Sequence, residues 1–125
     1  ITASGDNAQS LVSTPVADGA GGGGGAGSID VLTSSFGLSC ANLAASGGDG
    51  GESVGGHGAG GGGGGGLVRV QAPGLDAETC QPTAAGGQGG EVGNAAKATS
   101  GEPGLAIVNS QLPFNFIQES SPTCS

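Results

Sequence analysis

Two glycine runs constrain this chain more than any other feature. GAGGGGGAG at residues 19–27 leads directly into SIDVL, and GAGGGGGGG at residues 58–66 leads directly into LVRV. Glycine opposes helix formation, because each glycine costs about 1 kcal/mol relative to alanine in a helix interior. Either run alone is typical of a flexible linker. Because the same glycine-to-strand junction occurs twice, we expect the runs to be ordered elements of a fold.

The chain repeats itself with an offset of 39 residues. This offset superposes the two glycine runs and the strand patterns behind them, and it also places AASGGDGGE (44–52) over TAAGGQGGE (83–91). Such self-similarity predicts stacked repeats with atypical ends. We therefore expect a single domain, 1–125, which contains a lead-in strand in 1–18, repeats at 19–57 and 58–93, and a degenerate third unit with a tail at 94–125.

Short strand patterns dominate what remains. They cover Ile29–Thr33, Leu67–Ala72, Leu105–Asn109 and Phe114–Ile117, and the lead-in strand is expected around residues 9–13. A glycine run has no side chains to pack, so its ordered form is an extended helix with three residues per turn that bonds to neighbouring segments. The predicted fold is all-β and irregular, with short strands, packed polyglycine-II segments and essentially no α-helix.

Equivalent strands of successive repeats are expected to lie side by side. This register places Ile29 opposite Val68, Val31 opposite Val70, and Asp30 opposite Arg69. One face would then be apolar, and the other would carry an ion pair between strands. The alternative interpretation is that Arg69 is a solubilising surface residue.

The three cysteines also follow the repeat. Cys40, Cys80 and Cys124 are separated by about one unit, and equivalent positions in stacked units come within disulfide reach. We favour a bond between Cys40 and Cys80, and Cys80 with Cys124 is the alternative. The odd cysteine is then free or bonded to another subunit. No CxxC pair occurs, so we expect no metal and no cofactor.

The charge and composition of the chain limit the classes of partner and the cellular location that we expect. Ten acidic residues against Lys97 and Arg69 give a formal net charge of −8, which repels nucleic acid and anionic lipid. No apolar run approaches the roughly 20 residues of a membrane span. The start at Ile1 rather than at Met, the scarcity of lysine and the cysteines favour a processed, secreted product.

Catalysis has little support in the sequence. His57 is the single histidine, and GESVG around Ser53 lacks the preceding strand and the following helix of a nucleophile elbow. The acidic residues Asp49, Glu52, Glu91 and Glu102 are dispersed and do not form a calcium loop, so we interpret them as solvated charges. We expect no enzymatic activity.

GAGGGGGAGSIDVL, GAGGGGGGGLVRV and the paired GGxGGE blocks resemble glycine-rich domains in which polyglycine-II helices bundle beside β-strands. Such domains occur in tail-fibre tip adhesins of phages, in some receptor tyrosine kinase ectodomains, in springtail antifreeze proteins and in glycine-rich repeat proteins of bacterial surfaces. The resemblance covers residues 19–93. It implies an extracellular structural or binding function.

The predicted function is that of a structural subunit in an extracellular, pilus-like filament or surface assembly. The partner is then another copy of the chain, and apolar segments near both ends would add strands to a neighbour. The alternative is a binding module, either an adhesin tip with a surface or carbohydrate ligand or an ice-binding protein. The candidate assembly residues are Leu11, Val12, Val16, Leu112, Phe114, Phe116 and Ile117.

Overall fold

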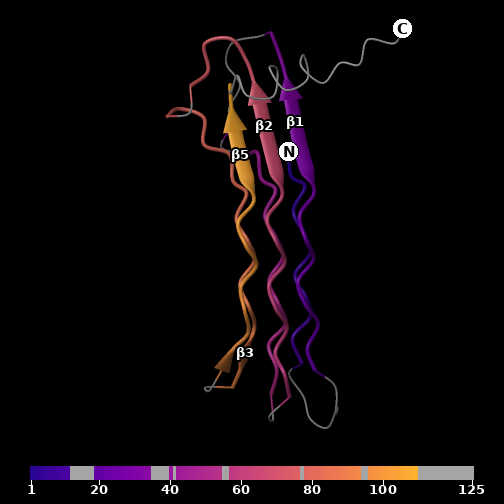
Figure 1. The fold of residues 1–125 in the computed structure, drawn as a ribbon. Coiled ribbons are helices and arrows are strands. Elements are labelled where there is room, and N and C mark those ends of the chain that lie inside the picture. The colour runs from indigo at the N-terminus through magenta and orange to yellow at the C-terminus, as the bar shows by residue number, and fades with distance from the viewer. Residues whose placement is uncertain are drawn as a thin grey trace, which may run out of the picture.

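The computed structural model describes residues 1–11, 19–34, 40, 42–54, 57–76, 78–93 and 96–109. These residues contain no helix, and hence none that could cross a membrane. They form a small parallel sheet, a short antiparallel pair and long irregular segments, drawn out into an elongated slab (Figure 1). The predicted strand at Phe114–Ile117 lies outside the described residues.

The parallel sheet has the strand order β1-β2-β5 and occupies one end of the slab (Figure 1). Its members are β1 (Ser28–Leu32), β2 (Leu67–Gln71) and β5 (Leu105–Val108). The three main strands predicted from the sequence are thus confirmed. The predicted register is confirmed as well, because Ile29 pairs with Val68, Asp30 with Arg69 and Val31 with Val70.

The structure adds an antiparallel pair that the sequence did not indicate. β3 (Glu91–Val92) pairs with β4 (Ala96–Lys97), and Gly93, at the start of the connection, has a positive φ of 51°. The predicted lead-in strand is absent over residues 9–11. Residues 1–11 are extended, but only Thr2 makes a β-bridge, to Ala44.

Beyond the sheet, the chain runs as extended segments in two layers of three. The first layer contains residues 1–11, 42–54 and 80–93, and the second contains residues 19–32, 57–71 and 96–108. Segments run parallel within a layer and antiparallel between layers, so each repeat supplies one segment to each layer. Figure 1 shows the six segments as wavy traces below the strands.

Backbone hydrogen bonds join these segments at every third residue. Gly60, Gly63 and Gly66 donate across the layers to residues 51, 48 and 45, at 3.0, 2.9 and 2.8 Å. Gly62 and Gly65 donate within the layer to residues 99 and 102, each at 2.9 Å. An extended chain with three residues per turn presents every third amide to the same neighbour, which explains the spacing.

Close packing explains why so many positions are glycine. A Cβ on Gly63 would lie 2.0 Å from the Gly24 carbonyl oxygen, and a Cβ on Gly48 would lie 2.0 Å from that of Asp6. By contrast, a Cβ on Gly25 or Gly58 would meet nothing within 4 Å. Glycine is therefore required where segments touch, and the outward positions are free of that constraint.

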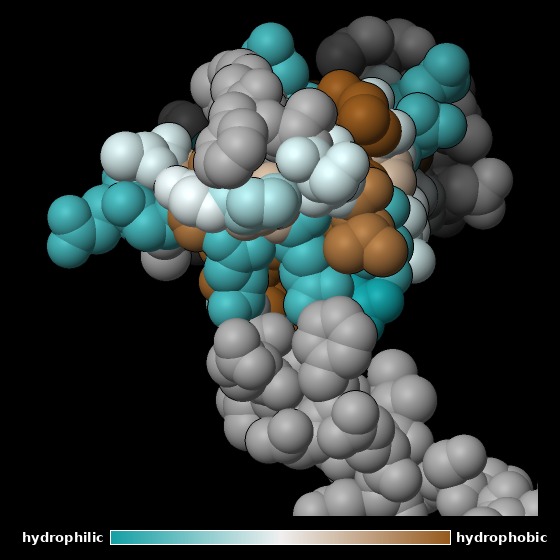
Figure 2. Space-filling view, turned by 90° about the horizontal axis from the view of Figure 1, so that it is seen from above, coloured by the Kyte–Doolittle hydropathy of each residue, from teal (hydrophilic) through white to brown (hydrophobic). Residues whose placement is uncertain are grey.

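Apolar side chains are concentrated at the sheet end. Ile29, Val68 and Val70 are buried against Leu43 and Ala45 of the first layer, beside a disulfide. Other hydrophobic side chains, among them Leu32 and Leu105, stay exposed, and Figure 2 shows brown side chains between polar ones on this end. The side-chain core is therefore confined to one end of the slab.

The disulfide joins Cys40 to Cys80, with their Cα atoms 5.0 Å apart, as the repeat equivalence predicted. Both cysteines are buried. Cys124 lies outside the described residues. A disulfide is consistent with an oxidising, extracellular location.

Two polar side chains shape the loop that carries Cys80. Asp76 accepts hydrogen bonds from the backbone amides of Thr79 and Glu78, each at 2.9 Å, and those from the Thr79 amide and hydroxyl hold the pKa of this carboxyl below its usual value. Asn109, which follows β5 with a φ of 47°, exchanges hydrogen bonds of 2.8 Å with the backbone of Ala72 and also donates to the Leu75 carbonyl. The loop is thereby tied to the strand end.

Candidate functional site

The predicted ion pair is present on the outer face of the sheet. The Arg69 guanidinium donates to both carboxylate oxygens of Asp30, with Nε to Oδ1 at 3.1 Å. This hydrogen bonding holds the pKa of Asp30 below its ordinary value and raises that of Arg69. The charges of Asp30 and Arg69 are paired with each other and remain accessible to solvent. We therefore interpret the pair as a contact that sets the register of neighbouring strands and not as a ligand site.

Three acidic residues of the first layer, Asp49, Glu52 and Glu91, lie on its outer face. Asp49 links three segments, because its amide donates to Asn7 Oδ1 at 2.8 Å and its carboxylate accepts from the Gln88 amide at 2.7 Å. Glu52 and Glu91 lie further along the same face and are exposed. Glu102 lies on the other layer, so the structure does not gather the four predicted acids. Among the described residues, no group of three potential metal ligands occurs.

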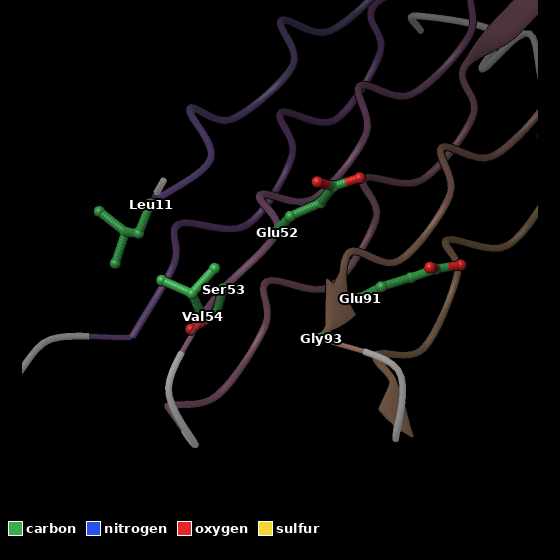
Figure 3. A pocket seen from close by; sticks show the side chains of 6 residues that line it. All are labelled: Leu11, Glu52, Ser53, Val54, Glu91 and Gly93. Carbon is green, nitrogen blue, oxygen red and sulfur yellow. The ribbon is translucent and has the colours of Figure 1, made fainter. Parts of the chain in front are cut away.

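A shallow pocket of about 120 Å³ surrounds Ser53 at the end remote from the parallel sheet (Figure 3). Ser53 is buried, and its hydroxyl has no hydrogen-bond partner in the described part of the chain. The side chains of Glu52 and Glu91 extend away from Leu11 (Figure 3). His57 makes no hydrogen bond with another described residue. The remaining lining residues are Val54 and Gly93.

Leu11 belongs to the chain's own fold. Its amide donates to the Glu52 carbonyl at 2.9 Å, and Ala8, Gly5 and Ala3 bond in the same way to the segment 42–54. The other predicted assembly residues, Val12, Val16, Leu112, Phe114, Phe116 and Ile117, lie outside the described residues. The N-terminal segment is therefore engaged within its own molecule over residues 1–11.

One free side of the stack offers unused hydrogen-bond acceptors, and we call it the acceptor edge. It is the outer side of residues 1–11 and 19–27. Inside the stack, the equivalent carbonyls all accept an amide of the preceding segment at 2.8–3.0 Å; these are the carbonyls of Ser46, Asp49, Glu52, Gly58, Gly61 and Gly64. At the acceptor edge the carbonyls without a hydrogen bond to described residues are those of Ser4, Asn7, Ser10, Gly19, Gly22 and Gly25.

The opposite side, formed by residues 80–93 and 96–104, is the donor edge. The equivalent amides inside the stack donate to the following segment at 2.8–2.9 Å; they belong to Gly47, Gly50, Gly62 and Gly65. At the donor edge their counterparts are Gly86, Gly89, Ser100 and Pro103. The Gly89 amide donates instead to Ser100 Oγ at 3.3 Å, and Pro103 has no amide hydrogen.

The two edges are thus complementary in hydrogen-bonding character, and their chemistry is that of the backbone. Sequence reasoning did not find them. In the structure, GDNAQ at 5–9 lies beside GGDGG at 47–51, so Asp6 and Gln9 stand where the next segment has Gly48 and Gly51. Comparisons with protein families, with curated proteins and with solved structures each give no match.

Proposed function

We propose that this chain is a structural subunit of an extracellular assembly, in which polyglycine-II segments act as rigid packing elements. The observation that supports this proposal is the hydrogen bonding at every third residue, which links the segments of both layers. Side-chain-free segments approach one another so closely that a slab of this size needs few apolar residues. A rigid, dense slab with two outer faces is suited to a structural role.

Several further features agree with this role. The disulfide suits an oxidising compartment, and the resemblance to glycine-rich surface and fibre proteins points to the same location. The net charge of −8 keeps copies apart in solution unless specific contacts or salt overcome the repulsion. We infer that the partners are other copies of the chain.

Amide hydrogen exchange tests the ordered backbone on which the role depends. The amides of Gly48, Gly63 and Gly87 are buried donors, and we expect them to exchange at least about a hundredfold more slowly than in an unfolded chain. Exchange at unfolded rates would remove the basis for a structural role. Electron microscopy at physiological salt then tests assembly: ordered fibres or layers support the subunit function, and dispersed single particles contradict it.

A binding module remains the second candidate because of one surface. The outward positions of the second layer are Gly22, Gly25, Gly61 and Gly64, so part of this face carries no side chains. This ordered face without side chains is the observation that favours ice binding. Thermal hysteresis that is present in the native chain and abolished by Gly25→Leu would favour this candidate, whereas its absence in the native chain would eliminate ice binding.

A further inference from the structure

Both edges carry side chains at positions where the equivalent residues inside the stack are glycine. In the first layer, Gly87 packs on the Gly48 carbonyl and Gly48 packs on the Asp6 carbonyl, each with a hypothetical Cβ at 2.0 Å. Asp6 is therefore the counterpart of Gly48 and Gly87 at the acceptor edge. Likewise, a Cβ on Gly90 would meet the Gly51 carbonyl, and a Cβ on Gly51 would meet the Gln9 carbonyl. Gln9 is therefore the counterpart of Gly51 and Gly90 at the acceptor edge.

These two side chains would obstruct any segment that continued the first layer. A second copy that docked on this edge in the register of the stacked segments would place its Gly87 and Gly90 carbonyls against Asp6 and Gln9. Inside the stack, a Cβ at such positions would lie 2.0–2.4 Å from a backbone oxygen, which no real packing tolerates. Asp6 and Gln9 are exposed in the chain as it stands, so they cause no strain within their own molecule.

The donor edge is closed by a different means. Pro103 occupies the position of Gly65, whose amide donates to the Glu102 carbonyl, and a proline cannot make that bond. Ser100 accepts the Gly89 amide through its hydroxyl, which withdraws a second donor from the edge. Two of the hydrogen bonds needed to extend the stack are thereby lost.

We propose that Asp6, Gln9, Ser100 and Pro103 cap the two edges and prevent copies of this chain from stacking head to tail. The occupant that they exclude is a second copy, because the donor edge of one copy otherwise matches the acceptor edge of the next in direction and spacing. Such a contact is heterologous and does not close, so without caps it would generate an open-ended polymer. This proposal concerns how copies associate, and it rests on the proposed structural function only in taking the extended segments as ordered.

The caps also bear on the route of assembly. If the stack is finite, contacts between copies come from the outer faces or from parts of the chain other than these edges. A subunit with closed edges can be stored at high concentration without uncontrolled growth, which is the purpose that edge protection serves in β-sheet proteins.

Three variants test the proposal in the full chain. The first, Asp6→Gly with Gln9→Gly, opens the acceptor edge. The second, Ser100→Gly with Pro103→Gly, opens the donor edge, because a Cβ at the equivalent Gly62 would lie 2.1 Å from the Gly87 carbonyl oxygen. The third combines all four substitutions. Sedimentation velocity follows association across a dilution series at low ionic strength, where the net charge of −8 keeps native copies apart.

Each variant has a distinct expected result. The fourfold variant forms polymers whose size grows with concentration, with an association constant at least about tenfold above that of the native chain. Either twofold variant alone associates no more than the native chain, but an equimolar mixture of the two forms heterodimers and stops there. Hydrogen exchange at the amides of residues 86 and 100 should slow on association, because these amides become donors in the new contact.

A charge control and a folding control complete the test. Gln88→Gly with Glu91→Gly removes one glutamine and one acidic residue, as the acceptor-edge variant does, but from the outer face. This control should behave like the native chain. A fourfold variant that keeps slow exchange at Gly63 yet sediments like the native chain overturns the capping proposal and leaves the structural function standing. Fast exchange at Gly63 in the native chain would instead defeat the structural function itself.

Discussion

Substituting alanine at two glycines of opposite environment measures how far bare backbone holds this fold together. Gly63 is buried between the layers, and its new Cβ would lie 2.0 Å from the Gly24 carbonyl oxygen. To restore an ordinary contact of 3.4 Å, the segments must separate by about 1.4 Å. Gly25 is exposed, and a Cβ there meets nothing within 4 Å.

The magnitude for Gly63→Ala follows from the hydrogen bonds around it. Separation breaks three backbone bonds of 2.8–2.9 Å: Gly48 to Gly24, Gly63 to Gly48, and Gly87 to Gly63. At about 1 kcal/mol each, and more where a buried group is left unpaired, the expected loss is about 3–5 kcal/mol in the free energy of unfolding. Gly25→Ala should instead stabilise by about 0.5–1 kcal/mol, because it reduces the entropy of the unfolded chain.

Differential scanning calorimetry and far-ultraviolet circular dichroism are the appropriate assays, since the chain has no Trp or Tyr for intrinsic fluorescence. The expected change in Tm is a fall of about 10–20 °C for Gly63→Ala and a small rise for Gly25→Ala. Equal Tm values for the two variants would refute the reasoning, because a flexible linker does not distinguish these positions.

Three further predictions concern the sheet end. Replacing Cys40 and Cys80 by alanine opens a disulfide with a sequence separation of 40, and calorimetry should show a loss of about 4 kcal/mol; an unchanged Tm would contradict this. Asn109→Ala removes the side-chain hydrogen bonds that tie the loop after β2 to the end of β5. Chemical denaturation should show a loss of about 2–3 kcal/mol in the free energy of unfolding. A loss below about 0.5 kcal/mol would mean that other contacts hold the loop. In NMR titration, Arg69→Gln should raise the pKa of Asp30 towards its ordinary value, because the guanidinium hydrogen bonds are lost. Since the pKa is lowered in the folded state, the stabilising effect of the pair is present above the unfolded-state pKa and disappears as the pH falls through the folded value, so the native chain and this variant should differ less in acid.

The strands and the disulfide could be predicted because side chains carry the signal. The alternation in Ile29–Val31 and Val68–Val70 marks a buried face, and the offset of 39 residues sets which strands are neighbours. Cys40 and Cys80 are separated by 40 residues, which is about one repeat. These inferences needed only the repeat and the chemistry of the residues.

The short antiparallel pair, the conformation of the N-terminal segment and the edge positions could not be predicted, because each depends on which segments lie beside it in the fold. Two-residue strands such as β3 and β4 have no periodic pattern. Residues 9–11 resemble a strand, but their backbone bonds at every third residue rather than alternately, so the predicted strand does not form there. The edge positions Asp6 and Pro103 become distinctive only once each is placed beside its glycine or amide counterpart in the next segment.

The confinement of the apolar core to one end has a thermodynamic consequence for the whole slab. Unfolding a conventional domain exposes mainly apolar side chains, which gives a large positive heat-capacity change and a sharply curved stability profile. Most of this slab would instead expose peptide groups, whose hydration contributes with the opposite sign. Its stability should therefore change almost linearly with temperature, and cooling should weaken it far less than it weakens proteins with a large apolar core.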